Sequence, residues 1–385
     1  MSDGKHAILS PSSSHIWLNC TPAARLGEKF NDEGSQYAAQ GTEAHSLAEY
    51  KLRKALGMDA EDPRGGLQFL DGEMEECTDD YVSFVLETLS KTREEHGTPD
   101  IYVEQKVDFS RWVPEGFGYA DCIIASEGKV SVIDLKYGTG VPVDARWNPQ
   151  FLLYALGTVD FLDFLCDVRE ITVTAFQPRL ESISSFTLTK ESLLEWADDT
   201  LKPKAELAYS GGGEFNAGEH CRFCKAKSCC RKRAERNLEL ARYDFAPPEE
   251  LSNLEIASIL AKADELASWV KDISQYALEK AIEGERFEGW KLVAGRSVRK
   301  YTDEDKVAEA AVAAGFDPYE RSVLGITAME KLMGKKRFGE VLGSLVVKPK
   351  GKPTLVPESD KRPAVDTAAE DFKKEDKQNL KEKSK

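Results

Sequence analysis

The stretch Val130–Gly140, VSVIDLKYGTG, is a β-branched run that carries an aspartate and a lysine before it reaches glycines. Alternating valines followed by isoleucine are typical of a buried strand. Because side chains on a strand alternate between its faces, Asp134 and Lys136 lie on the same face. Charged residues rarely occupy a strand interior without a partner or a function. The stretch therefore indicates either a structural ion pair or a chemical site.

The preceding residues, GYADCIIASEG, predict a second strand joined to the first by a hairpin. If Glu127 and Gly128 form a two-residue turn, Ser126 faces Lys129 and Asp121 lies directly opposite Asp134. Like charges in facing positions are destabilising, so a cation must compensate them. Lys136 supplies part of that compensation, and a hard divalent cation such as Mg²⁺ or Mn²⁺ could supply the rest. A three-residue turn would shift the register by one and separate the two aspartates.

The segments around the hairpin predict an α/β fold. A strand is expected over DIYVEQKVDF, and a helix begins at NPQFLLY with Asn148 as its cap. The strand EITVTAFQPR follows this helix, so strand, helix and strand form a right-handed crossover in one sheet. An earlier helix over GTEAHSLAEYKLRKAL places His45 and Glu49 on one face, and the later helix does the same for Gln150 and Tyr154.

Four short motifs now stand in order along the chain: GTEAHSLAE, GYAD, DLK and QFLLY. In the order and spacing of these motifs, residues 10 to 235 resemble the RecB-like branch of the PD-(D/E)XK nuclease superfamily. The proline that usually precedes the first aspartate is replaced by Ala120. The resemblance implies a restriction-endonuclease-like mixed sheet flanked by helices, and a metal-dependent DNA nuclease activity.

The resemblance also implies a role for each motif residue. Lys136 would orient or deprotonate the attacking water, while Gln150 and Tyr154 would position the DNA or the lysine. Glu104 is either a supporting carboxylate or a solvent-facing residue of an edge strand. The implied ligands of Mg²⁺ or Mn²⁺ are His45, Asp121, Asp134 and the backbone carbonyl of Leu135.

Three of the eight cysteines, Cys221, Cys224 and Cys230, have the spacing C-x₂-C-x₅-C. A fourth soft ligand is needed, and Cys20 is the candidate because it opens the region of resemblance. Four thiolates bind either Zn²⁺ or an iron–sulfur cluster. One group of RecB-like nucleases carries one cysteine before the nuclease motifs and three after them, which implies a 4Fe–4S cluster that clasps the two ends of the domain. Cys229 and His220 are spare ligands.

A basic run follows the last cysteine of this set. Arg231, Lys232 and Arg233 place positive charge beside the cysteine site, where they could contact DNA at the mouth of a channel. The alternative interpretation is a solvated helix face.

The composition indicates a soluble, cytoplasmic protein, and the resemblance to RecB-like nucleases implies the cytoplasm of a bacterial host or of a phage-infected cell. The 385 residues are 41% hydrophobic and 31% charged, without an apolar run near the about 18 residues of a membrane span. The net charge of −15 argues against a surface that coats DNA indiscriminately. No G-x-x-x-x-G-K-[ST] pattern occurs, so we expect no ATP motor.

Three regions are expected: a nuclease domain with the four-cysteine site (1–240), a helical and mixed region (245–345), and an extended to disordered tail rich in Lys, Pro and Glu (346–385). The whole chain, including GWKLVAGRSVRKYTDED, resembles an uncharacterised family encoded mainly by phages and prophages beside replication and recombination genes. That resemblance implies an exonuclease acting on DNA ends or single strands in recombination, replication or repair, with a single-strand-binding or annealing protein as a partner. Two alternatives remain open, an inactive nucleic-acid-binding scaffold and a zinc-stabilised interaction module.

Overall fold

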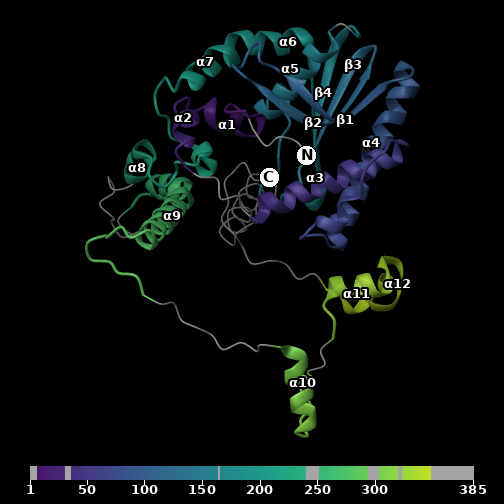
Figure 1. Ribbon diagram of the computed structural model, residues 1–385, viewed down its shortest axis with the longest axis vertical. Helices are drawn as coiled ribbons and strands as arrows, with labels where there is room; N and C mark the ends of the chain where they lie inside the picture. Colours follow the sequence, from purple (N-terminus) through teal and green to yellow (C-terminus); the bar gives the residue numbers. More distant parts are fainter. Residues whose placement is uncertain are drawn as a thin grey trace, which may run out of the picture. The chain divides into compact units, whose positions relative to one another are not determined.

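The computed structural model describes residues 7–30, 36–163, 165–239, 251–293, 303–319 and 323–347 (Figure 1). The chain divides into two compact units, Met1–Gly289 and Trp290–Lys385. The described part of the second unit is helical, with α10 (Glu304–Ala313), α11 (Ile326–Met333), α12 (Lys335–Leu342) and the 3₁₀ turn η8 (Gly343–Leu345). The predicted tail lies outside the described residues from position 348 onward. None of the helices in the described ranges could span a membrane.

The first unit is built on a five-stranded mixed sheet with the order β1-β2-β3-β4-β5. Neighbouring strands are antiparallel except for β3 and β4, which are parallel and joined through α5 (Pro149–Leu162), as the strand–helix–strand pattern predicts. The strands are β1 (Asp100–Asp108), β2 (Phe117–Ser126), β3 (Gly128–Leu135), β4 (Val168–Gln177) and β5 (Ser182–Thr189).

One face of the sheet is covered by α3 (Gln36–Ala55) and α4 (Gly72–His96), which pack against each other (Figure 1). Asp71 caps the N-terminus of α4, because its side chain accepts a hydrogen bond from the backbone N–H of Met74. Leu52 of α3 and Val85 of α4 are fully buried in a cluster with Ile133 of β3. The 3₁₀ turn η2 (Pro63–Gly66) lies between the two helices in the sequence. This layer places α3 over the strands that carry the acidic residues.

The other face is covered by α5, which begins at the Asn148 cap and is buried along most of its length. Gly118 of β2 allows this close packing, because a Cβ there would lie 2.9 Å from the ring of Tyr154. The remaining elements of this layer are α6 (Lys190–Trp196), the π-helical turn η4 (Ala197–Leu201) and α7 (Lys202–Ser210), and the 3₁₀ turn η3 (Pro178–Leu180) joins β4 to β5.

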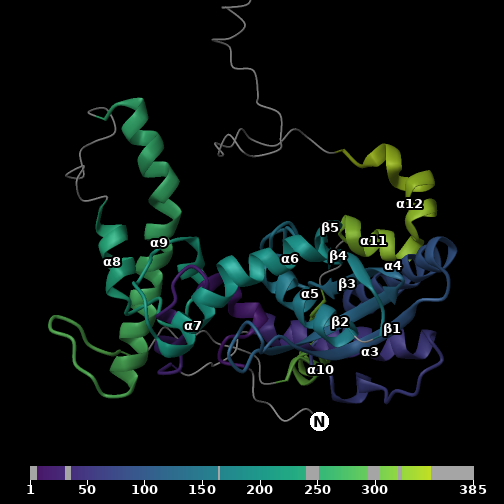
Figure 2. The same cartoon turned by 90° about the horizontal axis from the view of Figure 1, so that it is seen from above.

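The N-terminal segment lies against the segment that follows α7. The hydroxyl of Thr21 donates to the carbonyl of Gly212 at 2.7 Å, and the amide of Asn216 donates to the carbonyl of Asn19 at 3.1 Å. Helix α9 packs beside α8 at this end of the unit (Figure 2). The elements are η1 (Pro11–Ser13), α1 (Ser14–Trp17) and α2 (Ala23–Gly27), then η5 (Glu219–Phe223), α8 (Arg231–Leu238) and α9 (Asn253–Ile282).

Candidate functional site

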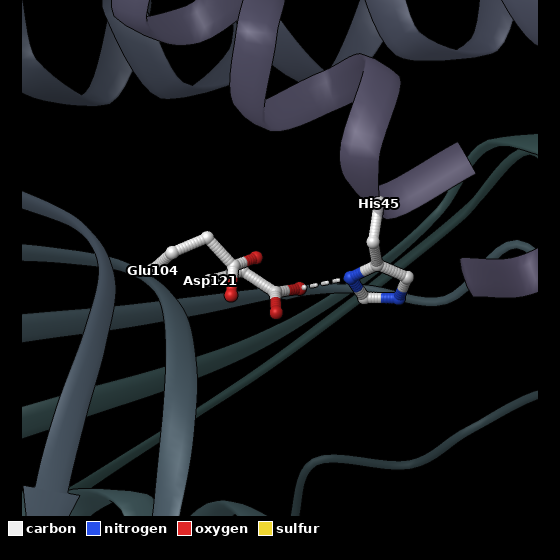
Figure 3. A group of neighbouring side chains, drawn as sticks. All are labelled: His45, Glu104 and Asp121. Carbon is white, nitrogen blue, oxygen red and sulfur yellow. Dashed lines mark ion pairs between the residues drawn. The ribbon is translucent and has the colours of Figure 1, made fainter. Parts of the chain in front are cut away.

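His45 reaches the sheet from α3. Its neighbours Ala44 and Leu47 are fully buried and fix the face of the helix that points inward. The Nδ1 atom of His45 lies 3.2 Å from Oδ2 of Asp121 on β2 (Figure 3). The early helix therefore delivers its histidine to the first predicted aspartate.

Glu104 completes a compact group with these two residues. The ligand atoms of His45, Glu104 and Asp121 all lie within 4.8 Å of one another (Figure 3). The residues on either side of Glu104 pair with β2: Val103 with Cys122, and Gln105 with Ala120. Glu104 and Asp121 therefore lie at the same level of the sheet, on neighbouring strands. Glu104 itself has a φ of 51°, in the left-handed region that a residue with a Cβ adopts only at a cost in free energy. The interpretation of Glu104 as a solvent-facing residue is wrong.

The predicted register of the β2–β3 hairpin is confirmed over its paired residues. Ser126 pairs with Lys129, and the ladder continues to Cys122 and Ile133. Gly128 has a φ of 78°, which suits glycine in the tight turn. Beyond this ladder, Asp121 crosses toward β3 and accepts a hydrogen bond from the backbone N–H of Leu135 at 2.7 Å.

Asp134, the second predicted aspartate ligand, lies beside Lys136. Its carboxylate is 2% exposed and is not part of the group formed by His45, Glu104 and Asp121. Instead, Oδ2 of Asp134 lies 2.7 Å from Nζ of Lys136, which also lies over the ring of Phe151 in α5. The positive charge of Lys136 therefore holds the second aspartate in an ion pair.

Burial and mutual charge shift the protonation equilibria of this cluster. Burial lowers the pKa of His45, but the charge and hydrogen bond of Asp121, together with the charge of Asp134, outweigh it and raise that pKa to about 9. Burial, reinforced by the charge of Asp121, raises the pKa of Glu104 to about 8. Burial likewise raises the pKa of Asp134 to about 6, although Lys136 opposes the shift. The carboxyl of Asp121 is also buried, yet His45 holds its pKa below the usual value. Burial is thus the main cause of the raised pKa values of Glu104 and Asp134, and the neighbouring charges modify its effect.

Gln150 and Tyr154 lie one turn apart on α5, as predicted. The amide Nε2 of Gln150 donates to the hydroxyl of Tyr154 at 3.3 Å. Tyr154 is 8% exposed, and burial raises its pKa well above the ordinary value, with the charge of Asp134 adding to the shift.

A pocket opens between α3, α4 and the strands beside the acidic cluster. Tyr81 of α4 lines it, and this residue was not anticipated from the sequence, where it reads as an ordinary core aromatic. Its hydroxyl is buried without a hydrogen-bond partner among the described residues. Glu49 also lines the pocket and pairs with Arg53 at 2.8 Å. The lining comprises His45, Ala48, Glu49, Leu52, Tyr81, Val103, Glu104, Asp121 and Leu135.

The four predicted cysteine ligands come together around a second pocket. Cys20, from the N-terminal segment, lines it together with Cys221, Cys224 and Cys230. Burial raises the pKa of Cys224 to about 11, and the charges of the other three cysteines add to the shift. His220 lines the same pocket, and a side-chain hydrogen bond with Cys20 raises the pKa of this histidine. The chain thus gathers four sulfur donors from its two distant segments.

The remaining cysteines lie elsewhere. Cys77 and Cys122 are buried among the apolar side chains of α4 and β2, as expected for ordinary core residues. Cys229 is exposed and does not line the cysteine pocket.

The predicted basic contact surface needs a correction at Arg233. This side chain is 1% exposed and lies 2.6 Å from Asp272 of α9, so it does not face solvent or DNA. Arg231 is 94% exposed and Lys232 is 52% exposed, and both lie within 4.0 Å of the carboxylate of Glu235. The acidic partner of Arg233 lies on another helix, which the local charge pattern does not indicate.

Comparisons with known proteins give one structural likeness and one family. A solved structure titled "Crystal structure of SSO0001" matches with 16% sequence identity and a TM-score of 0.24, over 50% of this chain and 98% of that chain. A TM-score this low does not establish a shared fold. A family model described as "Protein of unknown function (DUF2800)" matches residues 6–363. Since this match spans the four motif segments, both cysteine segments and most of the second unit, the chain belongs to the DUF2800 family.

Proposed function

We propose that this protein is a Mg²⁺- or Mn²⁺-dependent deoxyribonuclease with a RecB-like, restriction-endonuclease-like core. The observation that carries the proposal is the convergence of His45, Glu104 and Asp121 next to the buried pair Asp134–Lys136. A structural ion pair would account for Asp134 and Lys136 alone. It would not account for two further carboxylates and an imidazole gathered beside them, because burying like charges together is unfavourable unless a function requires it.

The donor set suits a hard divalent cation. Two carboxylates and one imidazole, contributed by Glu104, Asp121 and His45, are ligands that Mg²⁺ and Mn²⁺ accept. Asp134 and the backbone carbonyl of Leu135 are proposed to complete the set. Such an ion polarises a phosphate oxygen and makes a bound water more acidic. The chain's own residues then have to hold the phosphate and the water in line.

Lys136 is proposed to perform that task. Its ammonium group lies 2.7 Å from Asp134, which fixes its position. A fixed cation stabilises the negative charge that develops on the phosphate, and its N–H groups orient the attacking water.

Gln150 and Tyr154 are proposed to position the substrate or the lysine. They form a hydrogen-bonded pair on α5, and the pKa of Tyr154 responds to the charge of Asp134. The Asn148 cap fixes the first turn of α5, which carries Gln150, and would so hold the pair in position.

The cysteine pocket is proposed to hold a 4Fe–4S cluster as a structural clasp, with Zn²⁺ as the alternative occupant. The donors Cys20, Cys221, Cys224 and Cys230 suit a soft metal centre. A centre at this place would join the N-terminal segment to the end of the nuclease core.

The substrate is proposed to be DNA ends or single strands, handled as an exonuclease in phage-type recombination, replication or repair. A single-strand-binding or annealing protein would be the natural recipient of the product. The acidic net charge of −15 favours a local contact over broad coating of the duplex.

A nuclease assay tests the proposal. The purified protein is incubated with linear duplex, circular duplex and single-stranded DNA in Mg²⁺, in Mn²⁺ and in chelator. We expect metal-dependent degradation, and we expect Asp121→Asn to lower its rate by about 100-fold or more, since a charged metal ligand is replaced by a neutral amide. Asp144→Asn, in a loop outside the pocket, serves as the control. Metal-independent degradation, or equal rates for the wild type and Asp121→Asn, would show that the site is wrongly assigned, while DNA binding without degradation would favour an inactive scaffold.

A further inference from the structure

Arg233 of α8 is a charged residue in the protein interior. Its side chain is 1% exposed, and its Nη1 donates to Oδ2 of Asp272 at 2.6 Å and to the carbonyl of Lys227 at 3.0 Å. Its Nε is buried and has no hydrogen-bond partner within the described ranges. A buried N–H without a partner is destabilising, because it has lost its hydrogen bond to water. Such a group either destabilises the protein for no benefit or awaits an acceptor.

The position of Arg233 indicates which acceptor this is. Arg233 lines the same pocket as Cys20, Cys221, Cys224 and Cys230. We propose that Nε of Arg233 donates a hydrogen bond to a sulfur atom of the metal centre held by these cysteines, and that Asp272 of α9 fixes the guanidinium for this contact. This inference rests on the metal centre proposed above. It gives Arg233, which belongs to none of the nuclease motifs, the role of a residue that positions and stabilises this centre.

The charges around the pocket support the inference. Asp272 lies within 3.0 Å of both Lys227 and Arg233, so one carboxylate serves two cations. The wall of the pocket therefore carries an excess of one positive charge from these three groups. Solvent screens part of that charge, because Lys227 is 41% exposed, but thiolates bound to a metal centre are anionic and would lie beside it as counter-charges.

The arrangement also gives α9 a role. Asp272 lies 39 positions after Arg233 in the sequence and is 13% exposed, held on a helix that follows the nuclease core. Hydrogen bonds and charges around the sulfur atoms are among the factors that set the potential and retention of such centres. Helix α9 would thus act on the metal centre through Arg233.

The experiment uses the full chain purified without oxygen, as wild type, Arg233→Met, Arg233→Lys and Asp272→Asn. Lys232→Met is the matched control, because it removes a neighbouring positive charge that is 52% exposed. Iron and sulfide content, the rate of cluster loss in air, and the reduction potential are measured for each. We expect Arg233→Met to lose the cluster about 10-fold faster and to have a lower reduction potential, since partners of this kind typically contribute 10- to 100-fold to metal retention.

Arg233→Lys and Asp272→Asn should show smaller changes in the same direction, and Lys232→Met should match the wild type. A lysine keeps the charge but cannot reach Asp272 and a sulfur atom at the same time with a planar fork. If Arg233→Met does not fold, these two milder variants decide the question. Wild-type potential and loss rate in all Arg233 and Asp272 variants would overturn the inference.

The outcomes separate this inference from the proposal on which it rests. Zinc in the wild type at the four cysteines would overturn the iron–sulfur assignment alone, and release of zinc to a chromogenic chelator from the same variants would then test Arg233. A wild type without metal at these cysteines would overturn both. The nuclease assay is independent of each result, because it reports on His45, Glu104 and Asp121.

Discussion

Glu104 shows how a single residue shapes the candidate site. Its φ of 51° interrupts β1 between two residues that remain paired with β2. A residue with a Cβ costs about 1–2 kcal/mol in this conformation. This backbone conformation accompanies the placement of a second carboxylate, that of Glu104, beside Asp121. Backbone strain of this kind is concentrated at functional sites.

A substitution at Glu104 should separate stability from metal binding. In chelator at pH 7, we expect Glu104→Gln to raise the free energy of unfolding by on the order of 1 kcal/mol. Burial and the charge of Asp121 raise the pKa of Glu104 to about 8, so folding at pH 7 requires this carboxyl to take up a proton, whereas glutamine is already neutral. Mn²⁺ should stabilise the wild type, because a metal that binds only the folded protein raises its free energy of unfolding. In Glu104→Gln this stabilisation should largely disappear, because one metal ligand is missing. Urea unfolding in chelator and in Mn²⁺ measures both effects.

Glu127→Gln, in the exposed hairpin turn, is the matched control and should change neither quantity by more than about 0.5 kcal/mol. Equal metal-induced stabilisation of Glu104→Gln and the wild type would remove Glu104 from the ligand set.

At the scale of elements, the β2–β3 hairpin was predictable from the sequence. The neighbouring strand β1 was predictable as a strand, but the left-handed backbone at Glu104 was not. The two residues Glu127 and Gly128 define the turn, and the turn fixes the register. The sequence around Glu104 contains no glycine or proline that would signal a left-handed residue. The partner of Arg233 was equally hidden, because it depends on how α8 and α9 pack. Local chemistry determines turns, whereas contacts between elements depend on the whole chain.

The layer of α3 and α4 contains an ion-pair network with a defined pH dependence. Hydrogen bonds from Arg64 and then from Lys51 lower the pKa of Glu75 to about 2, at atomic separations of 2.7 Å. Because the folded-state pKa lies below the usual value of about 4.5, this network stabilises the protein fully above pH 4.5. Its contribution is lost as the pH falls from about 4.5 toward 2.

Glu75→Gln should therefore lower the free energy of unfolding by about 1 kcal/mol at pH 7, a value reduced for solvent screening because the carboxylate is 34% exposed. The difference from the wild type should narrow when urea unfolding is repeated near pH 3.5. Glu87→Gln, on the same helix and 64% exposed, should have a smaller effect at both pH values. A difference that grows on acidification would contradict the assigned network.

At the scale of the whole chain, four cysteines from two distant segments line one pocket. The spacing of the last three was visible in the sequence, and Cys20 could be added only through a family resemblance. The structure of the described residues brings these segments together by backbone contacts as well, including the bond from Asn216 to Asn19. A metal centre here would restrain a loop of about 200 residues in the unfolded chain.

Loss of one of these cysteines should therefore destabilise the whole domain and not only the residues around it. We expect Cys20→Ser to lose the metal and to lower the free energy of unfolding by roughly 3 kcal/mol or more, the scale of removing a crosslink across a long loop. Cys229→Ser is the control, because this thiol is exposed and lies outside the pocket lining, and it should keep both metal and stability. Metal content and thermal unfolding of both variants are measured under anaerobic conditions. Full metal content in Cys20→Ser would contradict the proposed clasp.

The central claim is that phosphodiester hydrolysis takes place beside the Asp134–Lys136 pair, and one rate comparison tests it most directly. Degradation of end-labelled linear DNA in Mg²⁺ is measured for the wild type, Lys136→Met and Lys129→Met, the last a lysine of the same strand that pairs with Glu170 near the turn. The account predicts a rate about 100-fold lower for Lys136→Met, with Lys129→Met close to the wild type. Equal rates for all three proteins, with folding intact, would contradict it.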